Sequence, residues 1–279
     1  MEDLWAHTQE PSRHAPWDLR FSAIEYLPRK HPGDPQRFRY ATRIGFNRTI
    51  TGWGESVASL EERRSVLKFG SDDPLSFIRE GAGFWEYQTG EGRCALETVY
   101  DYRTRGGLAG RWLDRGLFRP LMVWSTRWSF DRLRLQIERG MRPELTLRLW
   151  LLKVACRCAL GLVWCTEGLV PKILAVSSGE VELVRGSGLV LGSPLATLHA
   201  LGMAELLFGA WVLTGLLERV SVSLSVLGIL GLGGLVAWLD PSALANPLGG
   251  LTKNLGLLAC AAVVLGLEPL SPKAGRARP

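Results

Sequence analysis

Apolar residues are distributed unevenly along the chain, and the long apolar runs lie in its second half. The longest run covers residues 194–239, 46 positions in which only Glu205, Glu218 and Arg219 carry a charge. The hydrocarbon core of a bilayer is about 30 Å thick and takes a helix of about 20 apolar residues. This run is therefore long enough for two spans joined at Glu218 and Arg219, and it predicts a membrane protein.

Four segments have the length and composition of membrane spans. They are residues 145–169, 194–217, 220–239 and 251–267. Residues that end helices lie between them, including Pro171 after the first span and Asp240 with Pro241 after the third. We therefore expect an all-α four-helix transmembrane bundle over residues 148–268, with a turn at residues 246–250 before the last span.

Basic residues fall mainly on one side of the predicted spans. With the amino terminus in the cytoplasm, the cytoplasmic side carries Arg127, Arg132, Arg134, Arg139, Arg142, Arg148, Arg219, Lys273, Arg276 and Arg278. The opposite side carries Lys172, Arg185 and Lys253. The positive-inside rule then predicts a multi-pass protein of a bacterial cytoplasmic (inner) membrane, with both termini and a basic tail at residues 269–279 in the cytoplasm. Residues 1–20 contain no apolar signal segment, which fits this orientation.

Polar side chains within apolar spans are energetically costly and require a reason. The candidate intramembrane polar cluster consists of Lys153, Arg157, Glu167, Lys172, His199, Glu205, Lys253 and Asn254. One interpretation is a polar interior that binds a ligand, a quinone or protons. The alternative is structural: Lys153 snorkels to the membrane surface, Arg157 pairs with Glu205, and Glu167 and His199 lie near the outer interface.

Small residues within the spans carry two further predictions. Cys158 and Cys165 lie seven positions apart on one helix, which suits either redox chemistry or packing between helices. The glycines of the third span predict a close approach to a neighbouring helix; they are Gly228, Gly231, Gly233 and Gly234.

The first half of the chain has the composition of a water-soluble domain, since residues 1–148 hold 24 of the 33 basic and 20 of the 27 acidic residues. The two signs are interleaved, so the net charge of +6 does not indicate a nucleic-acid partner. A helical pattern over residues 3–18 precedes alternating segments that predict strands at residues 20–27, 37–46, 49–57, 63–69, 77–88 and 93–103.

From residue 110 to 139 the spacing of apolar residues becomes helical, at Leu113, Leu117, Leu121, Trp124, Trp128 and Leu135. We therefore expect an α+β fold over residues 1–140, an antiparallel sheet around a long carboxy-terminal helix, followed by a linker at residues 141–147. A cavity between such a sheet and helix takes apolar ligands. Its candidate lining residues are Trp85, Tyr100, Tyr102, Trp124 and Trp128.

The first half contains no coherent catalytic dyad. If the tyrosines at positions 100 and 102 point inward, Glu97 and Asp101 lie on the solvated face of the strand. The sequence has no nucleophile elbow, phosphate loop, dinucleotide glycine motif or metal-ligand spacing, so no catalytic, cofactor or metal residue is assigned. His7, His14 and His31 are interpreted as surface residues.

Three segments of the second half carry a family resemblance: WCTEGLVPKIL at residues 164–174, LGMAELLFGAWVL at 201–213 and NPLGGLTKN at 246–254. With the spacing of Glu167, Lys172, Glu205, Lys253 and Asn254, they make residues 148–267 resemble the DoxX-like membrane family. The resemblance implies an association with membrane redox assemblies and quinol oxidase subunits, and it raises quinone as a cofactor hypothesis. His199 is the only histidine within a predicted span, which argues against a haem subunit.

Three segments of the first half resemble the START/polyketide-cyclase (SRPBCC) superfamily, whose fold is called helix-grip. They are LWAHTQEPSRHAPWD at residues 4–18, ETVYDYRTRGGLAGRWLDRGLFRPLM at 97–122 and SFDRLRLQIE at 129–138. The resemblance covers about residues 2–140 and implies binding of lipids or other apolar ligands. The superfamily has a strand before its first helix, whereas only three residues precede Leu4 here.

Three hypotheses for the function follow. In the first, the cytoplasmic helix-grip module captures an apolar small molecule and hands it to, or senses it for, the DoxX-like bundle. In the second, the chain is a subunit of a quinone-linked membrane oxidoreductase that uses Glu167, Lys172, His199 and Glu205. In the third, it is a non-catalytic structural subunit of a membrane complex. The expected partners are the lipid bilayer, an apolar ligand and other membrane redox proteins.

Overall fold

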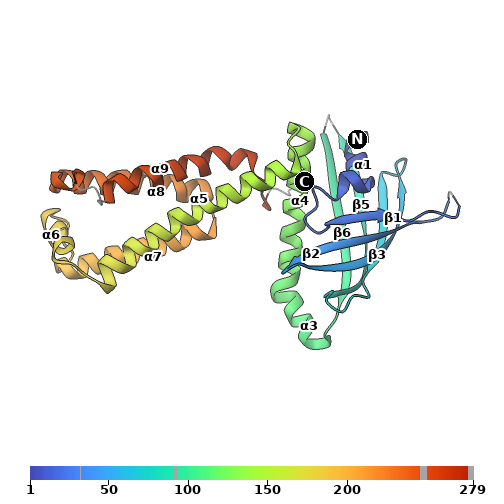
Figure 1. The fold of residues 1–279 in the computed structure, drawn as a ribbon, viewed down its shortest axis with the longest axis horizontal. Helices are drawn as coiled ribbons and strands as arrows, with labels where there is room; N and C mark the ends of the chain where they lie inside the picture. Colours follow the sequence, from blue (N-terminus) through green and yellow to red (C-terminus); the bar gives the residue numbers. More distant parts are fainter. Residues whose placement is uncertain (32, 91–92, 246–249, 276–279) are drawn as a thin grey trace. The chain divides into compact units, whose positions relative to one another are not determined.

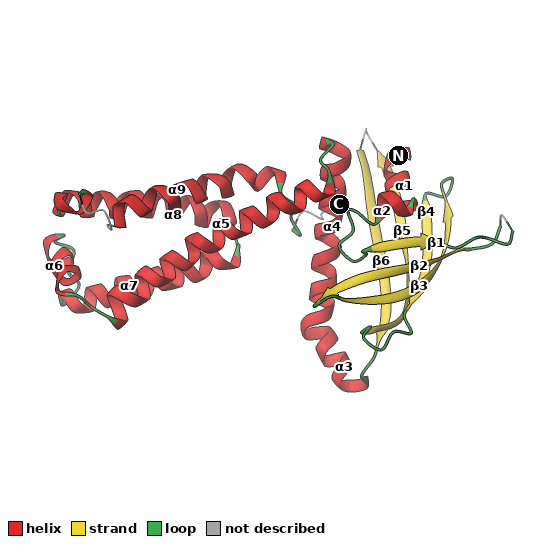
Figure 2. Cartoon of the chain, viewed as in Figure 1, coloured by secondary structure: helices red, strands yellow, loops and turns green. Residues whose placement is uncertain are grey.

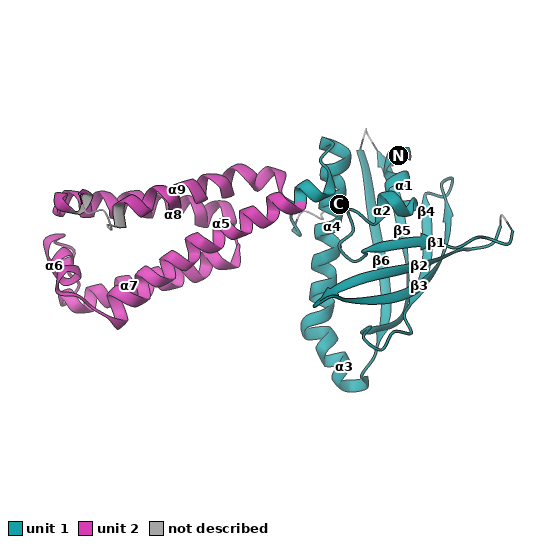
Figure 3. Cartoon of the chain, viewed as in Figure 1, with its two compact units in different colours: residues 1–146, 272–279 teal, residues 147–271 magenta. Residues whose placement is uncertain are grey.

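The computed structural model describes residues 1–31, 33–90, 93–245 and 250–275. The chain forms two compact units (Figure 3). The first unit comprises Met1–Thr146 with Pro272–Pro279, and the second comprises Leu147–Ser271. Residues 246–249 of the predicted turn, and Arg276 and Arg278 of the predicted tail, lie outside the described residues.

The first unit begins with two short helices, α1 (Glu2–Gln9) and α2 (Pro11–His14). Six strands follow: β1 (Ala23–Tyr26), β2 (Gln36–Gly45), β3 (Arg48–Ser59), β4 (Arg64–Gly70), β5 (Ile78–Gly90) and β6 (Arg93–Thr104). They pair in sequence order into one antiparallel sheet, drawn yellow in Figure 2. Among the described residues β1 and β6 are the edge strands, and no strand precedes α1.

After β6 the chain turns through Gly106 and Gly107, which both have positive φ, into an uninterrupted helical stretch. The stretch consists of α3 (Gly107–Leu113), a π-helical turn at Asp114–Phe118 and α4 (Arg119–Arg139) (Figure 1). Contacts tie α4 to one face of the sheet: the Tyr100 hydroxyl lies 3.2 Å from that of Thr126, and Ser129 accepts a hydrogen bond from the Leu19 amide. The predicted antiparallel sheet followed by helices is confirmed.

The second unit is helical, and its first long helix, α5 (Pro143–Leu169), begins in the first unit. The other helices are α6 (Ser178–Gly186), α7 (Pro194–Thr214), α8 (Glu218–Leu239) and α9 (Gly250–Leu267). Within the described residues, four helical stretches are long and apolar enough to cross a membrane: Pro143–Leu174, Pro194–Thr214, Glu218–Leu239 and Thr252–Leu270. The prediction of four spans is confirmed at this level.

Pro171 was expected to end the first span, but the helix does not end there. The helix continues through a π-helical turn at Val170–Leu174, closed by a hydrogen bond from the Ala175 amide to the Val170 carbonyl. Proline lacks the amide hydrogen that would reach the Glu167 carbonyl in a regular helix. The Lys172 ammonium donates to this carbonyl instead, at 3.1 Å. A side chain thus replaces the missing backbone donor, and the helix is extended rather than broken.

Glycines bring α5 and α7 into backbone contact. A Cβ atom on Gly209 would lie 2.7 Å from both the Cys165 amide nitrogen and the Gly161 carbonyl oxygen, and one on Gly168 would lie 2.5 Å from the Gly202 carbonyl oxygen. Gly161 therefore contacts Gly209, and Gly168 contacts Gly202. The two glycines on each helix are seven residues apart. Small residues are typical of close helix contacts in membranes. The sequence analysis placed the close approach on the third span instead.

The third-span glycines are only partly involved in packing. Gly228 in α8 lies under the Trp164 ring, whose indole donates a 2.6 Å hydrogen bond to Ser225. Cβ atoms on Gly231 and Gly234 would have no described atom within 4 Å. The prediction was wrong for these two glycines, because glycine content alone does not show which face of a helix meets a neighbour.

Candidate functional site

The second unit contains a buried ion pair between α7 and the π-helical turn that extends α5. The Lys172 ammonium lies 2.8 Å from the Glu205 carboxylate, and the two side chains are 11 % and 5 % exposed. Lys172 also donates to the Glu167 carbonyl that Pro171 leaves without a backbone donor. Glu205 is held against α5 because its Cβ packs over Gly168, where a larger residue would not fit. Two charges thus neutralise each other within apolar helices, as intramembrane ionisable groups require.

A second pair lies beside the first and is more open. The Lys253 ammonium at the start of α9 lies 3.7 Å from the Glu167 carboxylate, and these side chains are 63 % and 50 % exposed. Four of the eight residues predicted as a polar cluster therefore lie together: Glu167, Lys172, Glu205 and Lys253. We call these four the quartet.

Lys153 and Arg157 belong to a different ionic group. Glu218, the first residue of α8, accepts from Lys153 at 2.6 Å and from Arg157 at 2.8 Å. The predicted Arg157–Glu205 pair is therefore wrong. Glu205 packs beside Gly168, eleven residues along α5 from Arg157, which corresponds to about 16 Å of helix. Lys153 is 4 % exposed in this paired position, so it does not snorkel away from the bundle.

The side chains of His199 and Asn254 make no hydrogen bond or ion pair in the part of the chain that is described. His199 is exposed in the first turns of α7, and Asn254 is half-buried in α9. Cys158 and Cys165 are free thiols, and the Cys165 sulfur lies 3.7 Å from the Leu206 carbonyl oxygen on α7. This contact places Cys165 in the α5–α7 packing, and a redox role for the cysteines stays a prediction.

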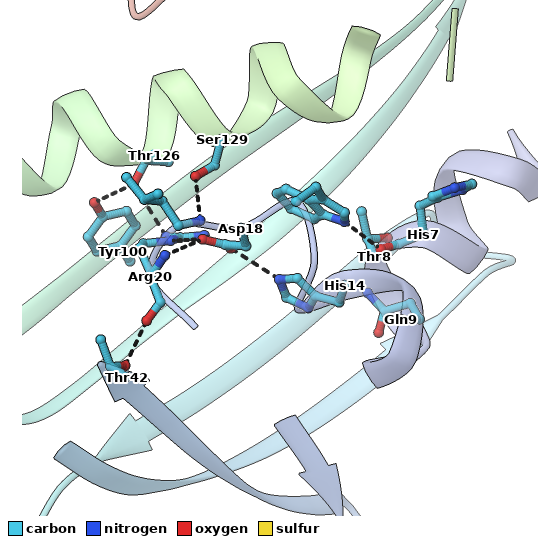
Figure 4. Close-up of polar contacts among 12 residues, drawn as sticks. His7, Thr8, Gln9, His14, Asp18, Arg20, Thr42, Tyr100, Thr126 and Ser129 are labelled. Atoms are coloured by element: carbon cyan, nitrogen blue, oxygen red, sulfur yellow. Dashed lines mark hydrogen bonds and ion pairs between the residues drawn. The ribbon is translucent and has the colours of Figure 1, made fainter. Parts of the chain in front are cut away.

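The first unit contains a buried polar network centred on Asp18 (Figure 4). Its carboxylate is fully buried and accepts two hydrogen bonds from the Arg20 guanidinium, at 2.9 and 2.6 Å, and lies 3.1 Å from the His14 ring. Arg20 reaches on to Thr126 of α4 at 3.3 Å, and its carbonyl accepts from Thr42 of β2. The segment between α2 and β1 thus ties the sheet to α4.

Electrostatics keep this network charged. Burial acts to raise the pKa of Asp18, but the charge and hydrogen bonds of Arg20, with those of His14, outweigh it and hold the pKa well below 3.8. Burial likewise acts to lower the pKa of Arg20, and Asp18 and Tyr100 more than compensate, so that pKa is raised. Asp18 and Arg20 are therefore an ion pair at every physiological pH.

The sequence analysis missed this network and misplaced His14. The His14 ring stacks on Trp17 at a centroid distance of 4.8 Å, and its side chain is only 12 % exposed, so it is not a surface residue. His14, Trp17 and Asp18 share one face of a helical turn, at positions i, i+3 and i+4. That spacing was the available signal, because Trp17 marks the face as buried.

The five predicted cavity residues lie in three different places. Trp85 is buried in a core with Trp17, Tyr87 and Leu133. Tyr100 faces α4, and the Tyr102 hydroxyl donates a 2.7 Å hydrogen bond to Asp114 in the π-helical turn before α4. Trp124 and Trp128 stack on each other, and Trp124 lines a surface groove of about 410 Å³ rather than the inner face of the sheet.

The face of the sheet that meets α4 carries a row in which aromatic residues and glycines alternate. The row runs across five paired strands: Phe38, Gly54, Phe69, Gly81 and Tyr102. A Cβ on Gly54 would lie 2.2 Å from the Phe38 ring, and one on Gly81 would lie 2.5 Å from the Phe69 ring. The glycines therefore let both rings lie over the neighbouring strand. All three aromatic side chains are only half-buried.

The described residues contain no group of three or more His, Cys, Asp and Glu side chains that could hold a metal ion. The ionic groups described above for the second unit are of two kinds. Lys172–Glu205 and Lys253–Glu167 are pairs of opposite charge. Glu218 forms a triad with two cations, Lys153 and Arg157. Such an arrangement can bind a polar head group or exchange a proton inside an apolar bundle.

Comparison with known proteins agrees with the membrane half of this description. Residues 161–262 match the DoxX-like family. The chain is also 43 % identical over 188 residues to the uncharacterized membrane protein YndG of Bacillus subtilis, covering 66 % of this chain and 70 % of that protein. The 188 aligned residues are more than the second unit, Leu147–Ser271, contains, so the similarity extends into the first unit.

Among solved structures, the chain is similar to TTHA0849 from Thermus thermophilus, with 18 % identity and a TM-score of 0.34 over 43 % of this chain and 77 % of that one. A likeness at this level carries no argument about the first unit, and its helix-grip assignment stays a prediction. The resemblance of the second half to the DoxX-like family is confirmed. The chain therefore belongs to the family of the Bacillus subtilis membrane protein YndG and is a membrane protein with a DoxX-like domain.

Proposed function

We propose that the first unit is a helix-grip module that binds an apolar small molecule on the inner face of its sheet and presents it to the DoxX-like bundle. The observation that supports this is the aromatic–glycine row. Phe38, Phe69 and Tyr102 lie inside the fold but stay half-buried, whereas Trp17, Trp85 and Tyr87 at the neighbouring core are closed off. Apolar surface left uncovered inside a domain favours a ligand.

The row also indicates the shape of the ligand. Rings that lie over glycines form a flat apolar floor, which suits a planar or polyisoprenoid molecule better than a branched one. At one end of the row, Tyr102 donates to Asp114, which in turn accepts from Arg119 at 3.1 Å. This end provides polar partners for a single oxygen-containing head group.

The test is to identify what co-purifies with the full-length protein in detergent. Solvent extraction and mass spectrometry are applied to the wild type, to Phe69→Ala and to the control Val66→Ala, whose side chain points to the opposite face of β4 and is 46 % exposed. We expect an apolar small molecule whose amount falls about tenfold in Phe69→Ala, corresponding to the loss of roughly 1.4 kcal/mol of ring contact. The control should retain it.

Two results would reject the proposal. One is equal retention in both variants, which would place the ligand elsewhere. The other is the absence of any bound molecule together with stable co-purifying proteins, which would favour a structural subunit of a membrane complex instead.

A second candidate function, a quinone-linked subunit of a membrane oxidoreductase, is favoured by the quartet. Lys172 and Glu205 provide a donor and an acceptor next to apolar helix surface, as a quinone head group needs. With menaquinone-4 as the probe, Glu205→Gln should weaken retention by about tenfold. The control Glu268→Gln removes another buried glutamate, which pairs with Arg219 at 2.7 Å outside the quartet. Equal effects of the two substitutions would reject this candidate.

A further inference from the structure

The helical stretch from α3 into α4 exposes an unusual number of large apolar side chains. Their exposed fractions are 70 % for Leu108, 77 % for Trp112, 51 % for Leu113, 61 % for Leu117 and 53 % for Leu121. Val123 and Trp124 are 40 % and 37 % exposed. Single exposed apolar residues are ordinary, but a continuous strip over four helical turns indicates a surface that another apolar phase covers.

The next part of the same helix is covered within the first unit. Arg132 donates to the Pro143 carbonyl, Asp131 accepts from the Lys273 amide, and Leu135 is fully buried. The exposed strip ends where these contacts begin, so α3 and the first turns of α4 are the uncovered part of one continuous helix (Figure 1).

Arginines accompany the strip along its length. Arg111, Arg115 and Arg127 are exposed and have no hydrogen-bond or ion-pair partner among the described residues. Arg115 and Arg127, with Arg119 and Trp124, line the groove of about 410 Å³. The one acidic residue in this part of the helix, Asp114, is 5 % exposed and points inward to Tyr102 and Arg119. Asp101 of β6 is an exposed acid beside this stretch, 3.8 Å from Arg119. The exposed surface is therefore apolar with an excess of positive charge.

We propose that this surface, formed by α3 and the first turns of α4, docks on the anionic lipid surface of the membrane that the second unit spans. Leucine and tryptophan side chains enter the headgroup region, while the arginines bind lipid phosphates, as in other interfacial amphipathic helices. The surface does not depend on the ligand site proposed above, because that site is built on Phe38, Phe69 and Tyr102, whereas the guanidinium groups of Arg111, Arg115 and Arg127 are exposed and unpaired among the described residues.

Two features favour lipid over a second copy of the chain. A symmetric contact would bring the same surface of two copies together and oppose their unpaired arginines, while the nearby exposed acid Asp101 is already paired with Arg119. The chain is also anchored: α4 ends at Arg139 and α5 begins at Pro143, so at most about 14 Å of extended chain separates this helix from the first span. Anchoring raises the local concentration of lipid far above that of any soluble partner.

The test uses full-length protein in vesicles of phosphatidylcholine alone or of equal parts phosphatidylcholine and phosphatidylglycerol. A fluorescent maleimide is placed on Leu117→Cys, with Leu121→Cys as a second site, in a Cys94→Ser background that removes the exposed native thiol. Phe46→Cys is the control site, because Phe46 is fully exposed in the β2–β3 turn. Quenching by aqueous iodide and by brominated lipid is measured for each.

In anionic vesicles we expect the labels at 117 and 121 to be shielded from iodide and quenched by brominated lipid, while the label at 46 shows the reverse. The triple variant Arg111→Glu, Arg115→Glu and Arg127→Glu should raise iodide quenching at 117 by about threefold or more, since each arginine contributes to binding anionic lipid. The matched control Arg39→Glu, Arg43→Glu and Arg48→Glu changes the net charge equally from exposed strand positions and should have no effect.

Three outcomes would overturn the proposal. Labels at 117 and 121 that are open to iodide in anionic vesicles would show a solvated surface. Shielding that persists in lipid-free detergent would show that protein covers it. Shielding that depends on protein density but not on lipid charge or the three arginines would show contact between copies.

Discussion

At the scale of single residues, the chain stabilises its buried charges by pairing them. Asp18 with Arg20 in the first unit, and Glu205 with Lys172 in the second, are each held by a partner close by in the fold. Removing one member of a buried pair leaves the other as an uncompensated charge, which is more destabilising than losing the pair as a whole. Substitutions of one member should therefore have large effects.

We expect Asp18→Asn to destabilise the first unit by about 3–5 kcal/mol, because the Arg20 guanidinium stays buried without a counter-charge. Denaturant unfolding followed by tryptophan fluorescence measures this, since Trp17 lies directly beside Asp18 and is fully buried. Asp72→Asn is the control, as Asp72 is exposed and makes no hydrogen bond or ion pair with the described residues. Similar midpoints for the two variants would contradict the role of the network.

The lowered pKa of Asp18 predicts a dependence on pH with a definite sign. In the unfolded chain the carboxyl takes up a proton near its ordinary value of 3.8, whereas in the folded unit it resists protonation. Its stabilising contribution is therefore complete above about pH 5 and is lost progressively as the pH falls toward the folded pKa. The difference in unfolding free energy between wild type and Asp18→Asn should shrink between about pH 5 and pH 3. A difference that stays constant or grows would contradict the pairing.

At the scale of elements, close backbone packing sets the positions of α5 and α7. Gly161 and Gly168 on one helix meet Gly202 and Gly209 on the other, and this contact fixes which side chains face each other across it. Lys172 and Glu205 meet because they lie at one end of this contact. The geometry of the ionic quartet thus follows from the glycines rather than from the charges.

We expect Gly209→Ala to destabilise the bundle by about 1–3 kcal/mol, since its Cβ would lie 2.7 Å from two backbone atoms of α5 that cannot move independently. Gly231→Ala is the matched control in open space, where alanine should stabilise the helix by up to about 1 kcal/mol. Thermal unfolding in detergent compares them. Equal melting temperatures would show that α5 and α7 do not approach this closely.

At the scale of the whole molecule, the four candidate spans predict that the first unit and the α6–α7 connection face opposite sides of the bilayer. The distribution of basic residues further predicts that the first unit is cytoplasmic. A membrane-impermeant maleimide applied to intact cells should label Leu189→Cys, which is 73 % exposed before α7, and should label Phe46→Cys only after lysis. Both variants carry Cys94→Ser. Labelling of both sites in intact cells would contradict the span count, and the reverse pattern would contradict the orientation.

The sequence by itself determined the order and type of the elements. Span length and helical or strand periodicity are local properties, so the four spans, the strand meander and the long helix from α3 to α4 were all recognisable from residue spacing. The four members of the quartet were among the eight predicted polar residues, because polar residues within apolar helices are rare enough to stand out, but the sequence did not separate them from Lys153, Arg157, His199 and Asn254.

The tertiary structure alone decided which residues meet. Arg157 pairs with Glu218 rather than Glu205 because the offset between α5 and α7 places Glu205 beside Gly168. Asp18 and His14 are buried because the chain turns inward at Trp17. Such contacts depend on helix offset and on the path of the chain, which arise from packing between distant segments. Residue spacing can mark a buried face, as for His14, Trp17 and Asp18, but it does not name the residues that cover that face.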